Sequence, residues 1–171
     1  MGERYLPAII AGLICAGILF LIFKENIIKE SKNNNEIKMS YHTNIIKETN
    51  ENTNFRKVLF TGTESQLVVM SIPAGGEVGE ETHKYTEQTL FFLSGNGEAT
   101  LDGVSTPIVP GDVYTVMPGT KHNFKNTGKE VMKIYTVYAP PNHIDGRMHV
   151  TKADADKDTE DEAVGESAPK K

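Results

Sequence analysis

The chain has 171 residues, of which 38% are hydrophobic and 24% charged, and its formal net charge is −5. This length suits one domain of ordinary size with additional segments. The negative charge, and the lack of a Lys/Arg stripe interleaved with aromatic residues, argue against nucleic acid as a partner. The single cysteine, Cys15, excludes an intramolecular disulfide and a cysteine-based zinc cluster.

Residues 5–23, which follow a short flank at 1–4, carry no charged side chain. Nineteen helical residues at about 1.5 Å each span about 28 Å, close to the thickness of the bilayer core. The segment therefore predicts one transmembrane helix. A cleaved signal peptide is the alternative, but its apolar region is usually shorter and no small-residue cleavage motif follows here.

The charges that flank this segment predict its orientation. Arg4 precedes the apolar run, and four lysines follow it, namely Lys24, Lys29, Lys32 and Lys38. Positive residues near a transmembrane helix are retained on the cytoplasmic side. We therefore expect a single-pass membrane protein whose main domain lies on the cytoplasmic side.

Two polar segments border the central part of the chain. Residues 24–54 are rich in Asn, Lys and Glu without sustained periodicity, which is typical of a flexible linker. Residues 151–171 contain seven carboxylates and four lysines. This composition predicts an acidic, disordered tail.

The central residues, 55–150, show short apolar runs separated by turn signals. These runs favour Val, Ile, Thr, Phe and Tyr, and they lie at 57–62, 66–72, 88–95, 97–103, 112–117, 122–126 and 131–139. Short strands with regular spacing and no helical period between them indicate an all-β sandwich or barrel. The glycines at 95, 97, 103, 111 and 119 are expected in turns that need positive φ.

Two motifs lie within this domain. In the first, His83 precedes an apolar strand that ends at Gly95; in the second, Gly111, Gly119, His122 and Asn126 follow in order. Together they resemble the paired motifs of a small single-domain cupin, over residues 57–141. The resemblance implies one jelly-roll β-barrel and, because cupins often pair through their sheets, a homodimer.

The first motif departs from the cupin pattern at two positions. Tyr85 stands where the second histidine of the His-x-His pair belongs, and alignment from Gly95 places Gln88 at the usual glutamate. The resemblance therefore implies a metal set of His83, Gln88 and His122. For Tyr85, metal ligation and a polar cap on the barrel mouth remain alternatives.

The donor set limits the metals that would fit. Neutral imidazole suits Fe, Mn, Ni, Zn or Cu, and oxygen ligands can complete the shell. A metal-dependent enzyme, an oxygenase or an isomerase acting on a small organic molecule, is one interpretation, with Glu87 as its base. The alternative is a non-catalytic, metal-free module that binds or senses a small ligand.

Three further polar residues receive simpler structural interpretations. His143 and His149 follow the last expected strand and are expected in surface loops, although they could also fold over the barrel mouth. Asn126 is expected to fix a turn through side-chain hydrogen bonds.

Overall fold

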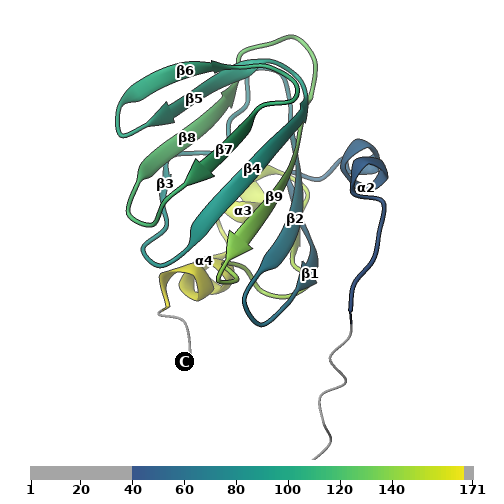
Figure 1. Ribbon diagram of the computed structural model, residues 1–171, viewed down its shortest axis with the longest axis vertical. Helices are drawn as coiled ribbons and strands as arrows, with labels where there is room; N and C mark the ends of the chain where they lie inside the picture. Colours follow the sequence, from purple (N-terminus) through teal and green to yellow (C-terminus); the bar gives the residue numbers. More distant parts are fainter. Residues whose placement is uncertain (1–39, 168–171) are drawn as a thin grey trace, which may run out of the picture. The chain divides into compact units, whose positions relative to one another are not determined.

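The computed structural model describes residues 40–167, and the chain from His42 onward forms one compact unit. Ten strands in the described part build two antiparallel sheets (Figure 1). The strands are β1 (Arg56–Thr61), β2 (Gln66–Ile72), β3 (Glu81–Thr82), β4 (Glu87–Ser94), β5 (Gly97–Leu101), β6 (Val104–Ile108), β7 (Val113–Val116), β8 (Lys121–Asn126), β9 (Met132–Ala139) and β10 (Met148–His149).

One sheet has six strands in the order β10-β1-β2-β9-β4-β7, and the other has four in the order β3-β8-β5-β6. The predicted jelly-roll sheets are confirmed, and all seven predicted strands are present. Sequence analysis missed β3 and β10, which have two residues each, and β6, whose residues are exposed apart from Ile108. Without an apolar alternation these three strands carry little sequence signal.

The interior is built by alternation along β4, β8 and β9. On β4 the inward positions are Gln88, Leu90 and Phe92, because successive side chains of a strand point to opposite faces. The corresponding inward residues of the other two strands are His122, Phe124 and Asn126 on β8 and Met132, Ile134, Thr136 and Tyr138 on β9. Each strand thus carries both apolar and polar side chains into the barrel.

Asn126 ties the end of β8 to two neighbouring segments. Its side-chain amide donates to the carbonyl oxygens of Ile72 and Glu130, at 2.9 and 2.8 Å, and its Oδ1 accepts from the backbone N–H of Gly128. The predicted turn-fixing role is therefore confirmed. Gly95 has the expected positive φ of 85°, whereas Gly97 serves instead to let the Lys125 carbonyl approach closely.

The segment expected to be a disordered tail is helical through Glu166. It forms α3 (Lys152–Ala155) and α4 (Thr159–Glu166), which Figure 1 shows in yellow. Asp158 caps α4, and acidic residues in its first turn complement the helix dipole. For residues 152–166 the prediction of disorder was wrong, because Asp161 is buried against partners distant in sequence, which local composition does not reveal.

The expected linker also contains structure near its end. Residues 45–51 form α2 (Ile45–Glu51), capped by the Asn44 side chain, and Thr49 of this helix is buried. The predicted transmembrane helix at 5–23 lies outside the described residues, so it and its orientation stay predictions. Within residues 40–167, no helix has both the length and the apolarity required to cross a membrane.

Candidate metal centre

Three potential metal ligands converge where β3 meets β8. Glu81 pairs directly with His122 across the two strands, and His83 follows two residues later. One ligand atom each from Glu81, His83 and His122 lies within 4.8 Å of the other two. The predicted meeting of His83 and His122 thus occurs, with ring centroids 5.2 Å apart.

The ring of His122 is held with one nitrogen free. Its Nδ1 lies 2.9 Å from the carbonyl oxygen of Thr120, which can only accept a hydrogen bond, so Nδ1 carries the proton. Burial lowers the pKa of His122 despite this hydrogen bond. The neutral ring therefore presents the lone pair of Nε2, which is the form that binds a metal.

Glu81 is kept ionised by its neighbours. Its carboxylate lies 3.5 Å from His83 Nε2 and 4.0 Å from an Arg56 guanidinium nitrogen. Burial alone would raise the pKa of Glu81, but the interactions with His83 and Arg56 outweigh it and hold that pKa below its usual value. A carboxylate next to two imidazoles is a suitable mixed donor set for a divalent transition metal.

Gln88 lies in the barrel interior, at the first inward position of β4. Its Nε2 donates to the Tyr138 hydroxyl at 3.0 Å, and the Tyr138 ring meets that of His83 edge-on at 5.7 Å. Burial, with the charge of Glu81, raises the pKa of Tyr138, so its hydroxyl stays protonated. The amide is thereby oriented, and its Oε1 is left buried without a hydrogen-bond partner.

Tyr85 and Glu87 are placed differently from these residues. Tyr85 is half-buried in the connection between β3 and β4, with its ring centroid 5.0 Å from the Lys84 ammonium nitrogen. Glu87 is adjacent to Gln88 on β4, and alternation therefore directs it to the outer face of the sheet. Glu81 is the carboxylate that lies beside His83.

Four potential ligand atoms in this region lack hydrogen-bond partners among the described residues. They are His83 Nε2, His122 Nε2, Gln88 Oε1 and Glu81 Oε2. A buried polar atom without a partner costs about 1–3 kcal/mol, so native proteins rarely retain several together. His83 Nε2 and Glu81 Oε2 face each other at 3.5 Å, whereas His122 Nε2 and Gln88 Oε1 have no such neighbour in the described part of the chain. All four atoms are of the type that binds a divalent cation, and the donor set therefore fits a metal.

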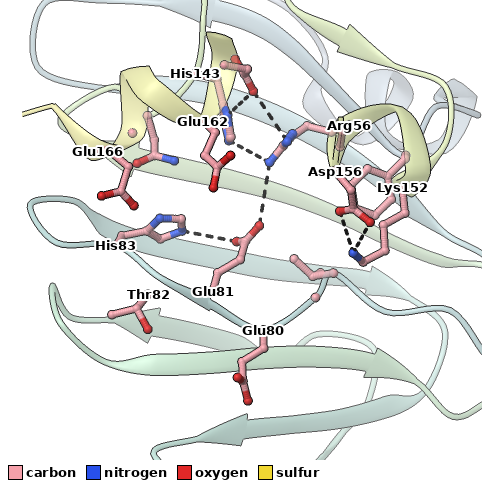
Figure 2. Close-up of a pocket in the computed structure, with 17 residues that line it drawn as sticks. Arg56, Glu80, Glu81, Thr82, His83, His143, Lys152, Asp156, Glu162 and Glu166 are labelled. Carbon is pink, nitrogen blue, oxygen red and sulfur yellow. Dashed lines mark hydrogen bonds and ion pairs between the residues drawn. The ribbon is translucent and has the colours of Figure 1, made fainter. Parts of the chain in front are cut away.

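A cavity of about 500 Å³ opens beside the cluster, between the β3 region and helices α3 and α4. Glu81 and His83 line it, and Figure 2 shows their side chains facing the α4 side. A cavity of this size is typical for a small-molecule site. The cluster is therefore accessible to a ligand held beneath α4.

A buried ionic network connects α4 with the cluster. Asp161 accepts from His143 Nδ1 at 2.9 Å and lies 3.6 Å from the Arg56 guanidinium, which also contacts His143 Nε2 at 3.3 Å (Figure 2). Burial lowers the pKa of His143, so its ring is neutral and donates to the Asp161 carboxylate. Arg56 in turn extends toward Glu81.

The surface-loop expectation for His143 and His149 was wrong. Both are buried, with 5% and 4% of their surface exposed, because α4 and the loop before it cover them. His143 bonds to Asp161, and His149 Nε2 lies 3.0 Å from Asp158. Their partners come from the segment predicted to be disordered, so the burial of both histidines could not be predicted from the local sequence.

Comparison with known proteins identifies the family of the β-domain. A family model described as the cupin domain matches residues 68–138. The crystal structure of BH2720 from Bacillus halodurans has a TM-score of 0.68 and 33% identity, over 70% of this chain and 96% of that one. The chain belongs to the cupin superfamily.

Two further proteins extend the comparison of this cupin. The uncharacterized protein YrkC of Bacillus subtilis is 39% identical over 118 residues, which cover 66% of this chain and 63% of that protein. The cupin thus matches less than two thirds of that relative's length. A Klebsiella pneumoniae protein with a double-stranded β-helix domain, at TM-score 0.53 and 24% identity, shares the fold.

Sequence analysis missed three residues of the cupin's site region: Glu81, Arg56 and Asp161. A signal for Glu81 was available, because residues i and i+2 of a strand share a face and His83 was already a candidate. Arg56 and Asp161 gave no such signal. They reach the site through the long-range pairing of β1 with β10 and the docking of α4.

Proposed function

We propose that this cupin binds one divalent transition metal through Glu81, His83 and His122, with Gln88 Oε1 completing the set. The observation that carries the proposal is the convergence of ligand atoms from Glu81, His83 and His122 within 4.8 Å, together with the buried His122 Nε2 and Gln88 Oε1, which are unpartnered among the described residues. Imidazole nitrogens with carboxylate and amide oxygens suit Fe, Mn, Ni, Cu or Zn. The metal would lie where the cavity beneath α4 meets the barrel.

The activity that this arrangement supports is metal-assisted chemistry on a small organic molecule, of the oxygenase or isomerase type. A bound divalent metal would act as a Lewis acid toward ligand oxygen atoms. The chain itself supplies orientation: Thr120 fixes the tautomer of His122, Tyr138 fixes the Gln88 amide, and Arg56 balances Glu81. Such supporting contacts hold ligands in place for binding.

A non-catalytic, metal-free binding module is the second candidate. It is favoured by the charge balance of the cluster, since Glu81 already has Arg56 and His83 as ionic neighbours. A carboxylate with such partners does not require a metal to be stable in a partly buried site. Metal content therefore separates the two candidates.

The test is metal analysis of the full-length chain after incubation with each candidate metal and removal of excess. We expect about one metal per chain in the wild type and a large loss in His83→Ala and His122→Ala, because each removes a nitrogen ligand. His42→Ala, which changes an exposed histidine outside the cluster, is the matched control. Absence of bound metal from all four proteins would support the metal-free module instead, and equal bound metal in all four would contradict the assignment of His83 and His122 as ligands.

A further inference from the structure

The cavity beneath α4 is bordered by two acidic side chains of that helix. Glu162 and Glu166 are one helical turn apart, and both line the cavity. Figure 2 shows their carboxylates directed from α4 toward the side on which His83 and Glu81 lie. Any ligand that enters between α4 and β3 would therefore meet them.

The other acidic residues that line the cavity each have a cationic neighbour. Glu80 lies 2.8 Å from Lys121, Asp156 lies 2.7 Å from Lys152, and Glu81 and Asp161 share Arg56. These pairs also occupy both cations that line the cavity, Arg56 and Lys152.

Glu162 and Glu166 differ from these paired acids. Among the described residues no hydrogen bond or ion pair reaches the Glu162 carboxylate, and Glu166 has only an electrostatic interaction with the exposed Lys84. The cavity therefore retains negative charge on its α4 side. An anionic ligand would be repelled there, and a cationic one attracted.

A second, independent feature of the cavity is a buried amide oxygen without a hydrogen-bond donor among the described residues. Asn142 lines the cavity with 5% of its surface exposed, and its Oδ1 has no hydrogen-bond partner. Gly165 of α4 packs directly against this amide, since a β-carbon there would lie 2.9 Å from Oδ1. A buried carbonyl oxygen is an acceptor only, so a ligand N–H or O–H would satisfy it.

We propose that this cavity binds a small organic cation of the amine class. Its ammonium group would lie between Glu162 and Glu166 and donate to Asn142 Oδ1, while its other end faces Glu81 and His83. The inference rests on the proposed function only for the end of the ligand that faces Glu81 and His83, where the metal would lie. The preference for an amine over a carboxylate follows from the cavity itself.

The test compares 1,4-diaminobutane with succinate, which has the same number of carbons and the opposite charge. Binding of each to the full-length chain is measured by titration calorimetry at low ionic strength, with and without bound metal. We expect the diamine to bind more tightly than succinate. A single partly exposed ion pair corresponds to roughly a fivefold change in affinity, so Glu162→Gln should weaken diamine binding about fivefold.

Glu160→Gln is the matched control, since Glu160 lies on the same helix but is paired with Arg147 outside the cavity. It should leave diamine binding unchanged. Tighter succinate binding, or equal diamine affinity in Glu162→Gln and the wild type, would overturn the inference. So would a Glu162→Gln variant that loses only metal affinity.

The same titrations separate this inference from the proposed function. If the chain binds no metal but still prefers the diamine and responds to Glu162→Gln, the amine site stands and the metal centre fails. If metal binds in the expected stoichiometry but the diamine does not, the amine site fails and the metal centre stands.

Discussion

The two ends of the barrel interior are built by the same strands but have opposite chemistry. Along β4 the inward side chains change from Gln88 to Leu90 and Phe92, and along β8 from His122 to Phe124. Asn126, the last inward residue of β8, is polar, but its amide is hydrogen-bonded on both sides. The side chains of the apolar end pack against one another, and the ring centroids of Phe92 and Phe124 are 5.4 Å apart. The polar end holds buried atoms without partners. The comparison indicates that one end supports the fold and the other is specialised for binding.

The largest effect is expected at the apolar end. Phe124 is fully buried among Phe92, Tyr114 and His122, so Phe124→Ala removes a large packed ring and leaves a cavity. We expect a loss of about 3–5 kcal/mol in the free energy of unfolding, measured by urea denaturation. A loss as large in His122→Ala, two residues along the same strand, would contradict the division between the two ends.

The network beneath α4 tests how the polar end is held. Asp161→Asn removes the buried charge beside Arg56 while keeping a side chain of similar size. Loss of one partner of a buried ion pair costs about 3 kcal/mol. The substitution leaves Arg56 with only the more distant Glu81 as an ionic partner among the described residues and replaces the carboxylate that accepts from His143. We expect this loss in urea denaturation. Asp156→Asn, which changes an exposed pair with Lys152, is the control and should cost less than about 1 kcal/mol.

Acid should lower the free energy of unfolding through the buried histidines of the polar end. Burial lowers the pKa of both His122 and His143 from the ordinary value of 6.5. Below about pH 6.5 the unfolded chain binds more protons than the folded chain, so the free energy of unfolding should fall as the pH decreases. Above this pH the contribution of the two neutral histidines to stability should be complete. Urea denaturation of the metal-free chain from pH 8 to 5 measures this.

His122→Gln removes one of the titrating rings and should make that decline shallower. The free energy of unfolding should fall further at lower pH, because the pKa values of Glu81 and Asp161 lie below the ordinary 4.5 and 3.8. In acid the unfolded chain therefore binds protons at these two carboxylates before the folded chain does. A stability that stays constant from pH 8 to 5 would show that neither buried histidine titrates as described.

Sequence reasoning predicted the apolar end better than the polar end, for a physical reason. Alternating residues such as Leu90 and Phe92 form a local pattern, and the two motifs located His83 and His122. Glu81 lies in a two-residue strand, so its only local signal is its position two residues before His83. Arg56, His143 and Asp161 come together only after α4 docks, so their burial depends on contacts across 87 and 18 positions of the chain.

The most direct test of the metal centre compares two adjacent carboxylates. Co²⁺ is titrated into the metal-stripped full-length chain, and its ligand-field absorbance reports binding, in the wild type, Glu81→Gln and Glu80→Gln. The substitutions remove the same charge, but Glu81 belongs to the cluster and Glu80 pairs with Lys121 on the surface. We predict at least about tenfold weaker binding in Glu81→Gln only, which corresponds to about 1.4 kcal/mol. Equal affinity in both variants would contradict the assignment of Glu81 as a ligand.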